Sequence, residues 1–209
     1  MGTGAVVMHK VSRPLVAIVG PTATGKSALA VELALQVRGE VVSCDSTAVY
    51  RGFDIGTDKL RMEDRRGVPH HLIDVVDPTE RYSAAQYARD AAAVIGQIAS
   101  RGCVPILVGG SGLYYRALTR GFFPGPGRDD RVRTRLARIA SRRGVTCLYR
   151  MVASIDPDSA LRIQSRDKKR LIRALEVYLL TGRTLTSHFA DTRSPVAAYE
   201  VMPFALRLS

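Results

Sequence analysis

The sequence predicts an α/β protein in which a parallel sheet is flanked by helices and carries a small, basic helical subdomain. Up to about residue 120, short apolar runs alternate with helical stretches, and the first apolar run leads directly into a glycine-rich loop. After a segment rich in proline and glycine at 122–127, the patterning becomes helical. Alternating strands and helices are typical of a doubly wound parallel sheet, and the helical stretch predicts the inserted subdomain.

The elements of the sheet follow in order from residue 15. Residues 15–19 (Leu-Val-Ala-Ile-Val) form an apolar strand, and 27–37 form the helix after it. Ser83 is the expected N-cap of a long helix that ends near Ser100. Positions 51–70 are polar and contain several glycines, which predicts a loop. The remaining expected strands are 40–43, 71–76 and 104–108, and another extended apolar segment begins at 196.

Four segments are expected along the chain. They are a flexible leader at 1–14, the α/β core at 15–121, the basic helical subdomain at 122–190, and a truncated return to the core at 191–209. Helical spacing of apolar residues places the helices of the subdomain at about 129–143, 145–153, 157–163 and 167–181.

Composition excludes several classes of protein. Of the 209 residues, 46% are hydrophobic, but no apolar run is long enough to span a membrane. Cys44, Cys103 and Cys147 are odd in number and far apart, which favours core thiols in a reducing cytoplasm over a disulfide framework. His70 and His71 lack partners at metal-ligand spacing, so they are expected to be structural. A cytoplasmic monomer is the expectation.

The net charge of +12 is concentrated in one region. Between Arg128 and Arg173 there are 14 basic and five acidic residues. Lys168, Lys169, Arg170 and Arg173 recur on one stretch of predicted helix, a pattern that suits RNA phosphates. The alternative is an arginine-rich, solvated helix surface. No aromatic-rich RNA-binding signature accompanies the charge.

The glycine-rich loop at 20–27 fits the phosphate-binding pattern G-x-x-x-x-G-K-[ST], with a strand before it and a helix after it. In such a loop, backbone N–H groups and the helix N-terminus surround an anion. Lys26 adds a point charge, and the Ser27 hydroxyl suits Mg²⁺. This predicts a P-loop NTPase-like core that binds a diphosphate or nucleotide. The residues expected to contact it are Gly20, Pro21, Thr22, Ala23, Thr24, Gly25, Lys26 and Ser27.

Polar residues follow two further strands. Asp45 lies at the carboxyl end of the second strand, where open α/β sheets bind ligands, so it is a candidate proton acceptor. Its alternative role is that of a turn or N-cap aspartate. Glycines at 109–112 again permit close approach of a ligand to the backbone. Lys59 is a possible second cation, although an isolated lysine is usually solvated. These residues favour a phosphate-loop enzyme acting on nucleic acid over a small-molecule kinase.

Several motifs in this order resemble the tRNA dimethylallyltransferase (tRNA isopentenyltransferase) family from about residue 14 onward. They are the loop at 20–27, Asp45 and Ser46 with 49–52 and 54–57, and the segments 71–74, 109–114, 156–157 and 169–177. The resemblance implies transfer of a dimethylallyl group from its diphosphate to N6 of adenosine 37, next to the tRNA anticodon, with release of diphosphate. The partners are then dimethylallyl diphosphate and the tRNA anticodon stem-loop, with Mg²⁺ as cofactor.

The resemblance also implies roles for residues. The loop holds the donor diphosphate rather than ATP, with Lys26 and a Ser27-bound Mg²⁺ stabilising the leaving group. Asp45 takes the proton of the adenine amine, and the base leaves its stack to reach it. The residues that match tRNA contacts are Asp45, Ser46, Thr47, Ala48, Ser111, Arg133, Lys169, Arg170, Leu171, Ile172 and Arg173.

The sequence departs from the family pattern at Thr47 and Ala48, at 58–60 and at 164–166. Members of the family also continue well beyond the position of Ser209, through helices that complete the tRNA channel. Two alternatives therefore stay open. One is a catalytically impaired RNA-binding fragment, and the other is an adenylate isopentenyltransferase that acts on a free nucleotide. The basic block argues against the second, because a mononucleotide does not need such a surface.

Overall fold

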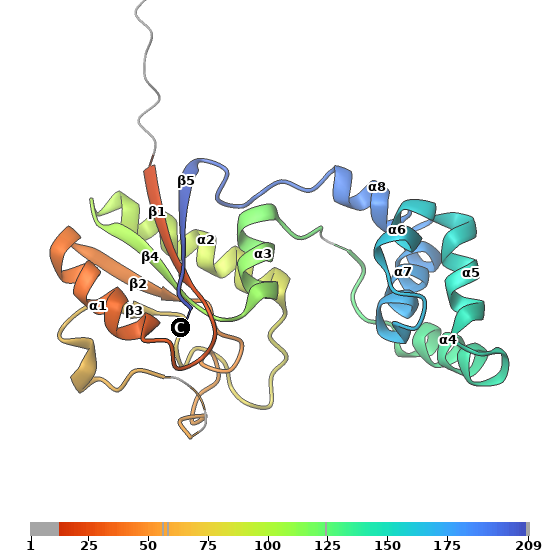
Figure 1. Ribbon diagram of the computed structural model, residues 1–209, viewed down its shortest axis with the longest axis horizontal. Helices are drawn as coiled ribbons and strands as arrows, with labels where there is room; N and C mark the ends of the chain where they lie inside the picture. Colours follow the sequence, from red (N-terminus) through yellow and green to blue (C-terminus); the bar gives the residue numbers. More distant parts are fainter. Residues whose placement is uncertain (1–12, 56, 58, 124, 208–209) are drawn as a thin grey trace, which may run out of the picture. The chain divides into compact units, whose positions relative to one another are not determined.

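The computed structural model describes residues 13–55, 57, 59–123 and 125–207, which divide into two compact units (Figure 1). Phe123–Thr192 forms a helical unit, and the described residues on either side of it form an α/β unit. Arg13 and Pro14 already belong to the first strand, so the leader predicted at 1–14 is too long at this end. The rest of that leader lies outside the described residues.

The α/β unit contains a five-stranded sheet in which every neighbouring pair is parallel. Its strands, in the spatial order β3-β2-β4-β1-β5, are His70–His71, Gly39–Ser43, Val104–Gly109, Arg13–Val19 and Tyr199–Ala205. The parallel sheet predicted from the sequence is confirmed.

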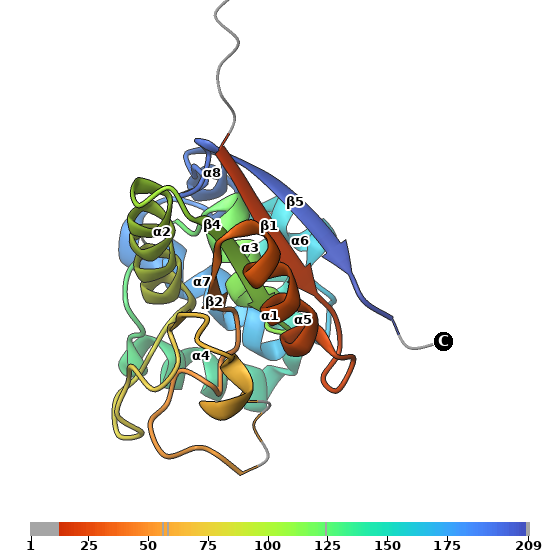
Figure 2. The same cartoon turned by 90° about the vertical axis from the view of Figure 1, so that its left-hand side faces the viewer.

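Helices cover both faces of this sheet (Figure 2). Because side chains alternate along a strand, Ile18 and Ile106 pack with α1 (Lys26–Val37) on one face. Leu15 and Leu107 pack on the other face with α2 (Ala84–Ser100) and α3 (Gly112–Arg120). These four side chains are almost completely buried. Burial of each Leu or Ile contributes about 1.5–3 kcal/mol to the stability of the fold. This packing fixes the carboxyl ends of β1, β2 and β4 relative to one another.

One prediction for the α/β unit needs correction. The strand expected at 71–76 is reduced to His70–His71, because Leu72 and Asp74 take left-handed conformations (φ 58° and 57°) that interrupt an extended chain. Val76 pairs only as an isolated bridge with Tyr50. Helix α3, which begins at Gly112 directly after β4, was not predicted. The predicted cap at Ser83 is confirmed, as part of a capping box with Gln86.

The helical unit has its own apolar core, centred on Leu136, Leu148, Val152, Leu171 and Val177. Its helices are α4 (Asp130–Arg143), α5 (Val145–Ile155), α6 (Pro157–Arg162), α7 (Lys168–Thr181) and α8 (Leu185–Ala190). The first four match the predicted helices to within two residues at each end, whereas α8 was not predicted. None of the described helices is long and apolar enough to cross a membrane.

The contacts of Asp156 show the structural role of the Asp-Pro pair at 156–157. Its carboxylate caps α6 by accepting from the Ser159 N–H (3.1 Å), and it binds the N–H and hydroxyl of Thr186 (3.0 and 2.6 Å) in α8. Burial alone raises the pKa of this carboxyl, but these hydrogen bonds lower it by more. The motif therefore has a structural role in joining two helices.

Candidate active site

The phosphate loop joins β1 to α1. Gly25 stands at the N-cap of α1 with φ +80°, a conformation that favours glycine. The first N–H groups of an α-helix have no partner within the helix, and the first turn of α1 contains no acidic residue. The start of α1 therefore presents backbone donors and the positive end of the helix dipole to an anion.

The Lys26 side chain folds back over this loop. Its ammonium group donates to the Pro21 carbonyl and lies 3.4 Å from the Thr24 hydroxyl. Residue 26 is only 5% exposed, which is unusual for a lysine. Oxygen atoms of Pro21 and Thr24 thus surround the Lys26 ammonium group. This positive charge lies in the loop, where a phosphate is expected to bind.

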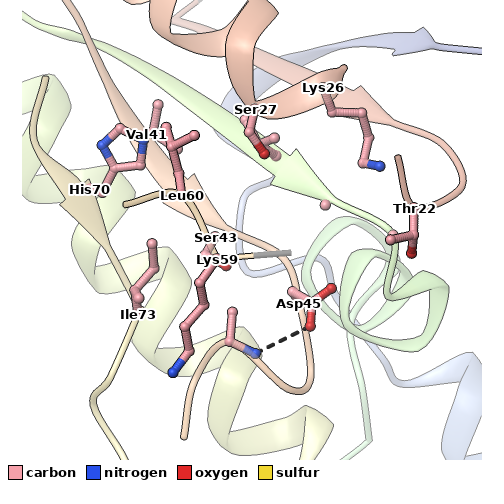
Figure 3. Close-up of a pocket in the computed structure, with 14 residues that line it drawn as sticks. Thr22, Lys26, Ser27, Val41, Ser43, Asp45, Lys59, Leu60, His70 and Ile73 are labelled. Carbon is pink, nitrogen blue, oxygen red and sulfur yellow. Dashed lines mark hydrogen bonds between the residues drawn. The ribbon is translucent and has the colours of Figure 1, made fainter. Parts of the chain in front are cut away.

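One pocket brings the loop together with residues from the neighbouring strands (Figure 3). The phosphate loop provides Thr22, Lys26 and Ser27, and the turn after β2 provides Asp45 and Ala48. Its other lining residues come from β2, from β4 and the glycines at its end, and from the segment around β3: Val41, Ser43, Val108, Gly109, Gly110, Lys59, Leu60, His70 and Ile73. Residues of the phosphate loop and the Asp45 carboxylate therefore line the same cavity.

Asp45 is both a turn aspartate and a pocket residue. Its Oδ1 accepts hydrogen bonds from the Thr47 N–H (2.8 Å), the Thr47 hydroxyl (2.6 Å) and the Ala48 N–H (3.2 Å). Burial alone raises the pKa of this carboxyl, but these hydrogen bonds and the Lys26 charge lower it by more. Asp45 is therefore ionised at neutral pH, and the turn fixes one of its two oxygens.

Ser111 connects two of the predicted site segments. Its hydroxyl accepts from the Ser46 N–H (2.8 Å) and lies 3.1 Å from the Ser46 hydroxyl, and its own N–H donates to the Cys44 carbonyl (3.1 Å). Gly109 makes this approach possible, since a Cβ there would lie 2.2 Å from the Cys44 carbonyl oxygen. The loops after β2 and β4 are consequently held side by side at the pocket.

Lys59, a possible second cation in the sequence, lines the pocket and is buried rather than solvated. Its side chain is 6% exposed, and its ammonium group donates to Asp74 (2.6 Å), Asp54 (3.0 Å) and the Tyr50 carbonyl (2.7 Å). Burial alone lowers the pKa of this lysine, but the two carboxylates raise it by more. Asp74 also donates its N–H to the Ala48 carbonyl (3.0 Å), so this cluster supports the turn that holds Asp45.

Lys59→Met is expected to destabilise the α/β unit by about 1.5–3 kcal/mol, the usual value of hydrogen bonds to a charged group. The raised pKa means that the lysine's contribution is fully present below the ordinary lysine pKa of 10.5 and disappears as the pH rises through its folded-state pKa. Urea denaturation at pH 7 measures the effect. Asp54→Asn, at a 72% exposed partner, is the control and should change stability by less than about 1 kcal/mol. An equal loss in both variants would contradict the central role of Lys59.

Arg133 and Arg173, two of the expected tRNA contacts, are held by one carboxylate in the helical unit. Glu176 is completely buried and accepts from Arg133 Nε and Nη2 (2.7 and 2.9 Å), Arg173 Nη1 (2.7 Å) and the Asp129 N–H (2.9 Å). Burial alone raises the pKa of Glu176, but the two guanidinium groups lower it to about 2. Both arginines remain partly exposed, at 29% and 28%, with further N–H donors available.

The neighbouring residues of α7 divide into two groups. Lys168, Lys169 and Arg170 are exposed, as a nucleic-acid surface requires. Leu171 is completely buried and Ile172 is 8% exposed, and both belong to the core of the helical unit. Their side chains therefore stabilise the helical unit, and a tRNA contact at these two positions stays a prediction. Leu171 and Ile172 directly follow the basic residues because successive residues of a helix point in different directions, some to solvent and some to the core.

His70 lines the pocket, whereas His71 and the cysteines do not. All three cysteines are free thiols, and burial raises the pKa of the Cys44 thiol to about 12. His71 pairs with Glu40 (2.7 Å), and His70 lies 2.8 Å from the Val68 carbonyl. In the described part of the chain, no three His, Cys, Asp or Glu residues are grouped so that they could hold a metal.

Comparison with known proteins finds matches both in sequence and in structure. The family model described as IPP transferase matches residues 48–209. A tRNA dimethylallyltransferase of Solibacter usitatus is 49% identical over 92% of this chain and 62% of the relative. A full-length tRNA isopentenylpyrophosphate transferase structure from Bacillus halodurans is 47% identical, with a TM-score of 0.54 over 81% of this chain and 56% of that one.

A second solved structure is of a eukaryotic dimethylallyltransferase acting on tRNA. It is 29% identical, with a TM-score of 0.73, and the match covers 93% of this chain and 48% of that one. The chain thus spans about three fifths or less of the length of these relatives. The family match extends over more than half of the chain and reaches the pocket from Ala48 onward. The chain belongs to the IPP transferase family.

Proposed function

We propose that this chain carries the donor and acceptor sites of an enzyme that transfers a dimethylallyl group from dimethylallyl diphosphate to N6 of adenosine 37 in tRNA. One observation carries the proposal: a single pocket contains both the phosphate loop and the ionised carboxylate of Asp45. The family membership and the names of the relatives support the same reaction. A cytoplasmic location and a monomeric state stay predictions.

The phosphate loop acts on the leaving group. Negative charge accumulates on the diphosphate as its bond to the dimethylallyl carbon breaks. Backbone N–H groups at the start of α1 and the Lys26 ammonium group stabilise this charge. To do so, Lys26 exchanges the Pro21 carbonyl for a phosphate oxygen.

Asp45 acts on the nucleophile. The adenine amine is weakly nucleophilic because its lone pair is delocalised, so it requires a proton acceptor as the new C–N bond forms. The carboxylate oxygen that the turn does not use, Oδ2, is suited to this step. The lowered pKa keeps Asp45 ionised, although it also makes the carboxylate a weaker base.

The pocket residues fit a magnesium ion. Ser27 and Asp45 provide oxygen atoms, the ligands that Mg²⁺ prefers, and Mg²⁺ usually keeps several waters and binds phosphate oxygens. When bound, the ion would supply further charge stabilisation for the diphosphate. Ser27 would hold it, with Asp45 nearby.

The proposal is tested with labelled dimethylallyl diphosphate, Mg²⁺ and two acceptors, an anticodon stem-loop and AMP. Label in the stem-loop supports the proposal. Label in AMP alone assigns the chain to adenylate isopentenyltransferases. If neither acceptor is labelled while the stem-loop binds with a steep salt dependence, the chain is an RNA-binding fragment and the proposed activity is wrong for it.

A further inference from the structure

A row of arginines runs along the outer face of α4 in the helical unit. Arg131, Arg135, Arg138 and Arg142 are all exposed and are spaced i, i+4, i+7 and i+11, which places them on one side of a helix. We call this set the arginine stripe. At 1.5 Å per residue it extends about 16 Å along the helix axis.

The stripe lies on the side of α4 opposite to Arg133 and the core residues of this helix. At 100° per residue, Arg133, Leu136 and Ala140 point away from it. Leu136 and Ala140 are buried in the core formed with α5 and α7, and Arg133 pairs with Glu176. The stripe is therefore a second cationic surface, separate from the arginines that Glu176 holds.

The charges of the stripe are not balanced within the helix. Among the residues that the structure describes, none of the four arginines forms an ion pair, and the single acid of α4, Asp130, pairs with Arg128 (2.6 Å). Like charges at i, i+3 and i, i+4 destabilise a helix, so the stripe opposes the stability of α4. All six basic residues of α4 are arginine, whose planar guanidinium group binds phosphate bidentately.

The surface beside the stripe is hollowed. Arg135, Arg138, Arg142 and the neighbouring Arg143 border a groove with Ile139 of α4 and with Cys147 and Met151 of α5. Cationic walls over a short apolar floor provide donors for phosphate oxygens and contact area for ribose. The apolar side of α4 is buried, so the helix has no face to insert into a lipid surface.

From the spacing, the lack of acidic partners and the groove, we propose that the arginine stripe binds the phosphate backbone of the RNA substrate, independently of base sequence. The proposal rests on the proposed function, which supplies the RNA. Contacts to phosphates fix the register and orientation of a protein on nucleic acid without reading its bases. The stripe would thus hold the RNA while other residues recognise the anticodon loop.

The test compares two variants of the 209-residue chain with equal changes in charge. The stripe variant carries Arg135→Gln, Arg138→Gln and Arg142→Gln. The control carries Arg81→Gln, Arg89→Gln and Arg116→Gln, which are exposed residues of the α/β unit. Binding of an anticodon stem-loop and of a scrambled hairpin of equal length is measured over a range of salt concentrations, and circular dichroism checks that each variant is folded.

The stripe variant should bind both hairpins about 10- to 100-fold more weakly at low salt. The slope of log affinity against log salt should become shallower by about 2, or about 0.7–0.9 per lost phosphate contact. The control should change affinity by no more than about threefold. Similar losses in both variants would reduce the effect to net charge and overturn the proposal, as would a stripe variant that binds like the parent chain.

Three further outcomes are informative. If the stripe variant loses binding to phosphatidylserine vesicles but keeps its RNA affinity, the stripe serves a membrane surface and the proposal is wrong. Dimethylallyl transfer is measured in the same preparations. Hairpin binding that depends on the stripe, without transfer by the parent chain, would contradict the proposed function and support the stripe. A parent chain that binds neither hairpin overturns the stripe proposal itself.

Discussion

Asp45→Asn is expected to lower the turnover of dimethylallyl transfer by about 100-fold or more, while donor binding stays largely unchanged. The substitution is nearly isosteric, and its side-chain oxygen can still accept from the N–H groups of Thr47 and Ala48. The turn should therefore keep its shape, whereas an NH2 group, which cannot take a proton, replaces Oδ2, the proposed proton acceptor. Single-turnover kinetics with separate measurement of donor affinity distinguishes the two effects.

The chain contains a matched control for this substitution. Asp77 makes the same local pattern as Asp45, accepting from the Thr79 N–H (2.9 Å) and hydroxyl (2.6 Å), but it does not line the pocket. Asp77→Asn should leave turnover within about twofold of the parent chain. Equal turnover in Asp45→Asn and the parent would show that Asp45 serves only the turn. Because the pKa of Asp45 is lowered, its ionisation should not limit the rate at neutral pH.

Glu176→Ala is expected to cost the helical unit about 3 kcal/mol of stability. It leaves Arg133 and Arg173, both more than two-thirds buried, without their shared carboxylate, and it removes the acceptor of the Asp129 N–H. Losing one partner of a buried ion pair usually costs about 3–5 kcal/mol, and the remaining exposure of the arginines favours the lower end. Chemical denaturation followed by circular dichroism measures the loss.

The pH dependence gives an independent check on Glu176. Its pKa falls to about 2 on folding, so its contribution to stability is fully present above the ordinary pKa near 4.5 and disappears as the pH falls toward 2. The difference between the parent and Glu176→Ala should shrink over this interval. Asp191→Ala, which removes the carboxylate of an exposed pair with Arg183, should leave stability almost unchanged. A small, pH-independent loss of stability in Glu176→Ala would show that Glu176 does not hold the two arginines.

The sequence predicted those features that depend on neighbouring residues. The phosphate loop, the strand before it and the helix after it lie within about thirty residues, and Ser83 is followed by Gln86 at capping-box spacing. Asp45 was identified because carboxyl ends of parallel strands gather at one edge of the sheet. Each of these inferences needed only local patterns and the topology of a parallel sheet.

The features that the sequence did not reveal depend on long-range contacts. Lys59 is buried only because Asp54, Asp74 and the Tyr50 carbonyl converge on it. Glu176 meets Arg133 from another helix. The left-handed Leu72 and Asp74 interrupt a segment whose composition favours a strand, since hydrogen bonds to Ala48 and Val49 determine its path. Local preference cannot anticipate such contacts.

The order of the strands has a consequence during synthesis. β5 pairs with β1 from Arg13↔Tyr199 to Val19↔Ala205, so partners in the sheet are separated by almost the whole chain. The helical unit, in contrast, is one continuous segment with a core of its own. At about 5–20 residues per second, β1 leaves the ribosome about 10–40 s before its partner, and its edge is unpaired in the meantime. The nascent α/β unit is therefore the part of the chain that most needs chaperones to protect it from aggregation. The helical unit, in contrast, can fold as soon as it emerges.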